Sequence, residues 1–157
     1  MSPVQEEAAT ARAGHRQPTV VSWLRLARVY QKVQQRTQRH LRQFGLTTAQ
    51  FDVLAQVGSA EGLSQQELAR RLLVTKGNVC GLVDRMADAG LVVRRADPDD
   101  RRAHRLELTD QGRQLYAVAV PSQEALIAEI FGGLDRDEQR ALQAMLRNVD
   151  HALDADA

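Results

Sequence analysis

The chain has 157 residues, of which 43% are hydrophobic and 26% are charged, as is usual for one compact globular unit. No apolar run approaches the roughly 20 residues that span a bilayer, and the N-terminal segment lacks the hydrophobic core of a secretory signal. A single cysteine excludes an internal disulfide. These features predict a cytoplasmic protein without a membrane segment.

The charge is distributed unevenly along the chain. Residues 64–105 contain nine Lys and Arg against six Asp and Glu, whereas residues 106–157 contain four against ten. We therefore expect the middle of the chain to face an anionic partner and the acidic C-terminal part to point away from it. The alternative is that these charges only solvate helix faces, but the central arginines converge on one loop.

The N-terminal third predicts a tail followed by a long helix. Residues 1–17 are rich in Ala, Gly, Pro and polar residues and predict a flexible tail. Apolar residues at helical spacing then predict a helix over residues 18–43, which Gly45 ends.

Capping signals divide the middle of the chain into three short helices. The pairs Thr47 with Gln50 and Ser64 with Glu67 match the capping box, so a helix is expected to start at each. A third helix is expected over residues 75–89, after a tight turn.

Residues 91–109, LVVRRADPDDRRAHRLELT, predict two short strands joined by a charged loop. The segment carries five arginines: Arg94, Arg95, Arg101, Arg102 and Arg105. So many guanidinium groups at a hairpin tip repel one another unless an anion meets them. Two helices joined by a turn and followed by such a hairpin form a winged helix–turn–helix, and its obvious anion is DNA phosphate.

The C-terminal part predicts two further helices. Thr109 is expected to open a long helix that Pro121 kinks and that ends at Phe131. Asp135 with Glu138 is expected to cap the last helix.

The predicted fold is therefore mainly α with a small β-hairpin wing. Residues 45–108 form the predicted winged-helix DNA-binding domain, and residues 18–44 and 109–155 form a helical dimerisation region. The terminal helices carry more apolar surface than a small domain buries, and reading paired half-sites needs two recognition helices, which together predict a homodimer. The alternative is that these helices pack only on their own chain.

These elements in this order resemble the MarR family of bacterial transcriptional regulators over residues 20–153. The resemblance is most specific in GNVCGLVDRMADAGLVVR at residues 77–94 and DPDDRRAHRLELTDQG at residues 97–112. The second segment is similar to the family's wing signature, an acid one residue ahead of an arginine and then an alternating strand that ends in Leu-Thr. The resemblance implies an obligate, triangular homodimer that binds pseudo-palindromic DNA, and repression that a small ligand or an oxidant relieves.

In such a fold the helix over residues 75–89 enters the major groove. Its expected base-reading residues are Thr75, Lys76, Asn78 and Cys80 or Gly81. Lys76 can donate to guanine, and Asn78 can pair with adenine through two hydrogen bonds. The alternative interpretation is that Thr75 and Asn78 are only cap and turn residues.

Phosphate contacts are expected on both sides of that helix. Ser64, Gln65 and Gln66 lie at a helix N-terminus, whose backbone N–H groups suit a phosphate oxygen. Their capping role does not exclude this contact. Arg85 is expected either to reach a phosphate or to pair with Asp84 or Asp88.

The resemblance assigns the wing its own contacts. Arg102 matches the family's tip arginine, which enters the minor groove, and Asp100 is expected to orient it through a charge-assisted pair. Arg94, Arg95 and Arg101 are expected on flanking phosphates. The alternative is an exposed loop of ion pairs, although such pairs contribute only about 0–1 kcal/mol each.

The resemblance also implies an effector cleft between the terminal helices and the winged unit. Its candidate lining residues are Trp23, Tyr30, His40, Phe44, Asp52 and Tyr116. Aromatic and polar groups together suit a small aromatic acid or phenol. The alternative is that each is an ordinary core or boundary residue.

Redox sensing, protein association and catalysis are the alternative functions. Cys80 is the single thiol and lies near the start of the expected recognition helix, so its oxidation would disturb DNA contact; a small packing residue is the simpler interpretation. A winged helix used only for protein association would not need an arginine-tipped wing. The scattered histidines show no metal-ligand spacing, and no nucleophile, phosphate-loop or dinucleotide motif occurs, so neither a metal, a cofactor nor an enzyme is expected.

Overall fold

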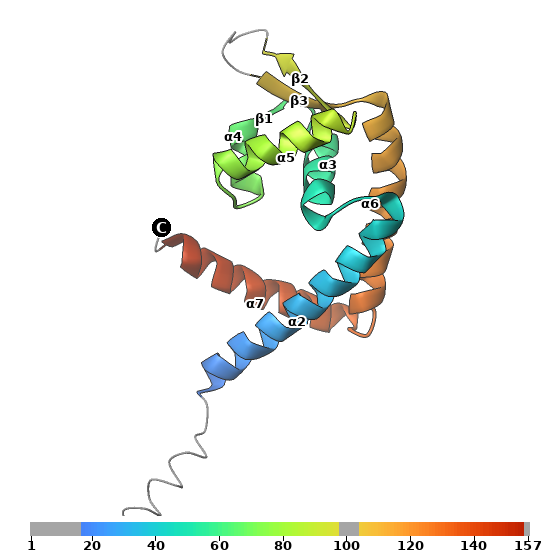
Figure 1. Ribbon diagram of the computed structural model, residues 1–157. Helices are drawn as coiled ribbons and strands as arrows, with labels where there is room; N and C mark the ends of the chain where they lie inside the picture. Colours follow the sequence, from blue (N-terminus) through green and yellow to red (C-terminus); the bar gives the residue numbers. More distant parts are fainter. Residues whose placement is uncertain (1–16, 98–103, 156–157) are drawn as a thin grey trace, which may run out of the picture. The chain divides into compact units, whose positions relative to one another are not determined.

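The structure is a computed structural model that describes residues 17–97 and 104–155 (Figure 1). The chain divides between Arg36 and Thr37 into two compact units. Helix α2 (Pro18–Leu41) starts in the first unit and ends in the second. Within the two described ranges, no helix has the length and apolar character that crossing a lipid bilayer requires.

The described part of the first unit is the N-terminal portion of α2. Proline suits the first helical position, where Pro18 lies, because its missing N–H would have no intrahelical partner. Large apolar side chains remain exposed along this portion: Val20, Trp23, Leu24, Leu26, Val29 and Tyr30. Trp23 is 64% exposed and Tyr30 is 61% exposed, so this stretch of α2 carries an uncovered apolar face.

The second unit contains the remaining elements. After α2 they are η1 (Arg42–Phe44), α3 (Thr48–Ser59), β1 (Leu63–Ser64), α4 (Gln65–Arg71), α5 (Lys76–Asp88), β2 (Val92–Ala96), β3 (His104–Leu108), α6 (Asp110–Phe131) and α7 (Arg136–Ala155). The long N-terminal helix thus ends two residues before the predicted Gln43, because the chain tightens into a 3-10 turn before Gly45.

The capping signals set the helix starts as the sequence predicts. Both capping boxes form: the Thr47 side chain accepts the Gln50 N–H, and the Ser64 side chain accepts the Glu67 N–H. Thr109 caps α6 by accepting the Gly112 N–H at 3.0 Å. The helix runs through Pro121 to Phe131. Local side-chain chemistry therefore decides where these helices begin.

The predicted hairpin is part of a three-stranded antiparallel sheet in the order β1-β3-β2. Strand β3 pairs Leu108 with Val92 on one side and Leu106 with Leu63 on the other. Strand β1 is not predicted from the sequence, because a two-residue strand has no alternation to detect.

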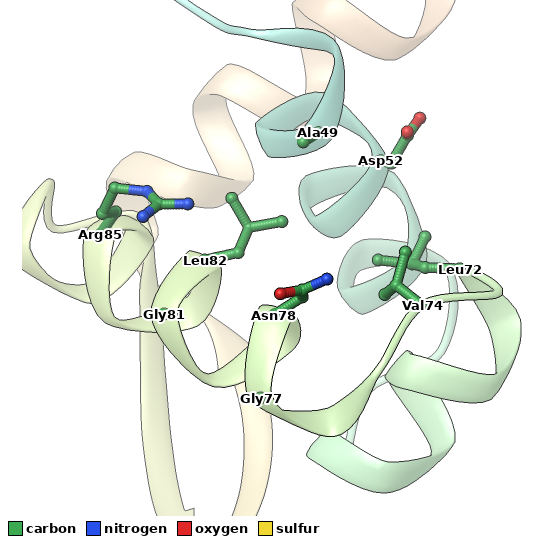
Figure 2. A pocket seen from close by; sticks show the side chains of 9 residues that line it. All are labelled: Ala49, Asp52, Leu72, Val74, Gly77, Asn78, Gly81, Leu82 and Arg85. Atoms are coloured by element: carbon green, nitrogen blue, oxygen red, sulfur yellow. The ribbon is translucent and has the colours of Figure 1, made fainter.

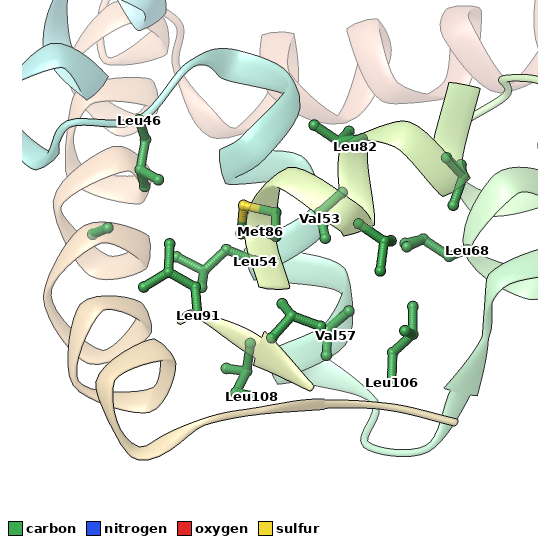
Figure 3. Close-up of a cluster of buried hydrophobic side chains, with 14 of the residues drawn as sticks. Leu46, Val53, Leu54, Val57, Leu68, Leu82, Met86, Leu91, Leu106 and Leu108 are labelled. Carbon is green, nitrogen blue, oxygen red and sulfur yellow. The ribbon is translucent and has the colours of Figure 1, made fainter. Parts of the chain in front are cut away.

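The core of the second unit lies where α3, α4, α5 and the sheet meet (Figure 3). Leu54 of α3, Met86 of α5 and Leu106 of β3 are completely buried there. Helix α6 packs against α3, and the contact is so close that a Cβ on Gly58 would lie 2.3 Å from the Tyr116 ring. Val79, Val83 and Met86 of α5 belong to this core, which leaves the opposite face of α5 outward.

Candidate nucleic-acid interface

Helix α5 has one buried face and one exposed face. Val79, Val83 and Met86 are fully buried. Lys76 and Asn78, in the first turn, are exposed. Because the Thr75 hydroxyl caps the helix through the backbone N–H of Asn78, the amide side chain of Asn78 is not the group used in the cap. Capping by Thr75 and outward display of Asn78 are therefore compatible.

Cys80 lies beside this face and is partly buried. Among the described residues no group of three or more His, Cys, Asp or Glu side chains is placed to hold a metal ion. Base reading or oxidation at Cys80 stays a prediction.

The start of α4 is occupied by its own cap. Glu67 accepts hydrogen bonds from both the N–H and the hydroxyl of Ser64, each at 2.8 Å. These bonds hold the pKa of the Glu67 carboxyl below its usual range, so it is ionised at neutral pH. A carboxylate at this helix start repels phosphate, which favours the capping role of Ser64 over a phosphate contact.

The two glutamines next to Ser64 differ in exposure. Gln66 is exposed, whereas Gln65 is partly buried and its side-chain NH₂ group is buried without a hydrogen-bond partner in the structure. Of the predicted phosphate contacts at this helix start, Gln66 is thus the one displayed to solvent.

Ion pairs hold the base of the wing. Arg105 of β3 donates two hydrogen bonds to the Asp97 carboxylate, at 2.8 and 3.2 Å. The Asp97 side chain is only 16% exposed, so this pair is more shielded from water than most surface pairs. Asp97 directly follows β2 and Arg105 lies in β3, so the pair joins the two chain ends that flank the segment between these strands.

Two arginines of β2 also form ion pairs. Arg94 donates to Asp84 of α5 at 2.6 Å, and Arg95 donates to Glu107 of β3 at 3.2 Å. The first pair ties the wing to the helix with the exposed Lys76 and Asn78, and it gives Asp84 a partner other than Arg85. Arg94 and Arg95 can contact phosphates through guanidinium N–H groups that these bonds do not use, or by breaking the ion pairs. The predicted contacts at Asp100, Arg101 and Arg102 lie outside the described residues.

A pocket of about 380 Å³ lies between α3 and α5 (Figure 2). Asn78, Leu82 and Arg85 line it from α5. Ala49 and Asp52 line it from α3, with Leu72 and Val74 at the turn that leads into α5. The pocket therefore brings one predicted effector residue, Asp52, together with one predicted DNA-reading residue, Asn78.

The other predicted effector residues have different surroundings. His40 Nε2 lies 3.0 Å from the Ser122 hydroxyl of α6, and the His40 ring meets Phe44 edge to face. Tyr116 packs against the core beside Gly58. Trp23 and Tyr30 belong to the first unit, where the Tyr30 hydroxyl accepts a hydrogen bond from Gln34. An effector role for these residues stays a prediction.

We expect Asp52→Asn to stabilise the protein at neutral pH. Asp52 is exposed as a whole residue, but neighbouring atoms partly shield its carboxyl from water; this desolvation raises the pKa of the carboxyl, so the folded state disfavours the ionised form. The resulting penalty is present above the raised pKa and disappears as the pH falls below the unfolded value of about 3.9. Thermal unfolding from pH 7 to pH 3 should therefore show a higher Tm for the variant at pH 7 and a shrinking difference toward pH 3.

Asp110→Asn is the matched control, because the Asp110 side chain is 96% exposed and pairs with Arg113. It should give no gain in Tm at neutral pH. A Tm difference for Asp52→Asn that stays constant across the pH range would show that burial of the charge is not its cause.

Comparisons with known proteins match this geometry to one family. The MarR family model matches residues 44–103, from the end of η1 to the wing. An uncharacterized HTH-type transcriptional regulator of Bacillus cereus is 35% identical over 128 residues, which cover 81% of this chain and 85% of that protein. The chain belongs to the MarR family of transcriptional regulators.

Solved structures of this family share the fold. CouR, a transcriptional repressor solved with a 23-mer DNA duplex, is 33% identical with a TM-score of 0.69, over 80% of this chain and 89% of CouR. A MarR variant from Escherichia coli, solved with operator DNA, is 28% identical with a TM-score of 0.75, over 83% and 95% of the two chains. The predictions of a winged helix–turn–helix and of a transcriptional regulator rather than an enzyme are confirmed.

Proposed function

We propose that this MarR-family regulator is a homodimeric repressor that binds a pseudo-palindromic operator and is released by a small aromatic acid or phenol. The observation that carries the proposal is the outward face of α5, where Lys76 and Asn78 are exposed beside a wing rich in arginine. Cationic and amide side chains at a helix start suit guanine and adenine edges. CouR and MarR, which share the fold, were solved with DNA.

The two DNA-facing elements divide the task. Lys76 and Asn78 read bases in the major groove, and Arg102 enters the adjacent minor groove. We assign Arg105 and Asp97 a positioning role, because their ion pair joins the two chain ends that flank the loop with Arg102. A rigid wing base lowers the entropic cost of placing an arginine in a narrow groove.

Dimerisation is supported by the uncovered apolar face of α7. Met145, Leu146, Val149 and Leu153 recur at helical spacing, and each is more than 40% exposed. Leu146, Val149 and Leu153 line one groove together with Gln143, Arg147 and Asp150. A stripe of this kind on a terminal helix needs a second apolar surface, and a second copy of the chain supplies one through two-fold symmetry.

We expect Val149→Glu to convert the dimer to monomer and to weaken operator binding together with it. A carboxylate in the middle of the apolar stripe would have to be buried without a partner, and each monomer alone reaches only one half-site. His151→Glu is the matched control, since His151 is exposed on the opposite face of α7. Sedimentation measures the oligomeric state. Titration with operator DNA, at the same fixed protein concentration, measures the affinity.

A Val149→Glu protein that stays dimeric would rule out α7 as the interface. A protein that becomes monomeric and keeps full operator affinity would contradict dimeric recognition.

The pocket between α3 and α5 gives the proposed effector a place next to the DNA-reading residues. A carboxylate there can pair with Arg85, while the ring contacts Leu82 and Val74. Because Asn78 lines the same pocket, a bound ligand and an operator base would compete for its side chain. Titrating benzoate or phenol into the protein–operator complex tests whether such compounds release the DNA.

A further inference from the structure

Leu73, in the turn between α4 and α5, has a left-handed backbone. Its φ of 53° is the one positive φ of a non-glycine residue among those described. The turn closes with hydrogen bonds from the Leu73 N–H to the Arg70 carbonyl and from the Val74 N–H to the Ala69 carbonyl. Glycine usually occupies this position after a helix, because a side chain in this conformation costs free energy.

The Leu73 side chain gains almost nothing from its own chain in return. It is 92% exposed, whereas its neighbours Leu72 and Val74 line the pocket between α3 and α5 (Figure 2). Leu73 instead lines a second hollow, to which Val74 and Asn78 also contribute. The turn therefore exposes a large apolar side chain to water, and its left-handed backbone conformation is itself unfavourable for a residue with a side chain.

The surroundings of Leu73 point to an anionic partner with an apolar group. The hollow is lined by Gln66 and Arg70 of α4 and by Thr75, Lys76 and Asn78 at the start of α5. Two cations and three hydrogen-bonding side chains thus lie around Leu73, and Ala69 and Val74 complete the lining. This combination suits the major-groove edge of DNA, where thymine offers a methyl group beside phosphates and polar base edges.

We propose that Leu73 is a specificity-determining residue that contacts the 5-methyl group of an operator thymine. The proposal rests on the proposed function, in which the start of α5 lies in the major groove. Leu73 then selects thymine in each half-site next to the bases that Lys76 and Asn78 read. The left-handed turn serves to aim the side chain outward.

The test uses the duplex that the wild-type protein selects from random-sequence DNA. Each thymine is replaced in turn by deoxyuridine, which keeps base pairing and lacks the methyl group. At one thymine of each half-site the replacement should weaken wild-type binding roughly fourfold, the value of one buried methyl group. Leu73→Ala, which keeps a Cβ in the same left-handed conformation, should bind the thymine and deoxyuridine duplexes equally.

The Leu73→Gly variant separates the effect of the side-chain contact on binding from the effect of the backbone conformation on stability. Glycine relieves the left-handed conformation, so this variant should unfold at a Tm about 2–4 °C higher while it also loses the thymine preference. A merely structural role for Leu73 would raise the Tm and leave the preference unchanged.

Three outcomes overturn the proposal. Leu73→Ala or Leu73→Gly can retain the wild-type sensitivity to deoxyuridine, or the wild-type protein can bind every deoxyuridine duplex as tightly as the thymine duplex. A wild-type protein that selects no duplex at all overturns the proposed function itself, which distinguishes the two failures.

Discussion

An Arg102→Ala variant is expected to bind operator DNA at least about tenfold more weakly than the wild-type protein. An arginine in a narrow minor groove meets concentrated negative potential, and a specific contact of this kind is worth about 1–3 kcal/mol. A dimer loses the contact twice. The pair of Asp97 and Arg105 holds the base of the wing, so removing Arg102 should change the DNA contact without loosening its support.

Arg140→Ala is the control for charge. Arg140 is an exposed arginine of α7 that pairs with Asp137, and it carries the same charge in the acidic part of the chain. Titrations at several salt concentrations should show a shallower salt dependence for Arg102→Ala and an unchanged one for Arg140→Ala. Equal operator affinity of the Arg102→Ala and wild-type proteins would contradict a contact between Arg102 of the wing and the DNA.

The largest expected effect on stability is that of Gly112→Ala. A Cβ at Gly112, in the first turn of α6, would lie 2.0 Å from the Leu91 carbonyl oxygen, which is backbone and cannot rotate away. The Thr109 cap fixes this turn by accepting the Gly112 N–H, while the Thr109 hydroxyl donates to the Gly90 carbonyl. We expect a loss of roughly 3 kcal/mol, or about 6–12 °C in Tm.

Gly77→Ala provides the comparison. Gly77 lies in the first turn of α5 after the Thr75 cap, and nothing lies within 4 Å of the Cβ that alanine would add. Its Tm should stay level or rise slightly, since alanine favours the helix by about 0.5–1 kcal/mol. Melting both variants at one protein concentration checks the pair, and similar Tm values for the two would contradict the close approach of α6 to Leu91.

The helix boundaries could be predicted because their causes are local. Thr47 with Gln50 and Ser64 with Glu67 are three residues apart, and their capping boxes form as expected. The outward face of α5 was likewise readable, because its buried stripe follows helical periodicity. These features require no knowledge of how distant segments meet.

The ion pairs of the wing could not be predicted in the same way. The pairing of Arg105 with Asp97 depends on the register of β2 and β3, and that of Arg94 with Asp84 on how the sheet meets α5. The sequence predicts a phosphate contact for Arg94 but not its carboxylate partner, since nothing in the order of residues brings Asp84 close. Both ion pairs therefore depend on how separate elements are placed in the fold.

The predicted effector residues show the same limit. Asp52 was grouped with aromatic residues of the terminal helices, whereas the structure places it at a pocket with Asn78 and Arg85 of α5. Leu73 gave no sequence signal, because its importance lies in a backbone angle and an exposure.

The most direct test of the account is a selection of random-sequence duplex DNA by the purified protein, followed by titration of the selected duplex across a salt series. We predict one enriched, pseudo-palindromic sequence whose half-sites lie about 10 base pairs apart, and an affinity that falls steeply with salt. No enriched sequence, with equal binding to selected and random duplexes at every salt concentration, would contradict operator recognition by α5 and the wing.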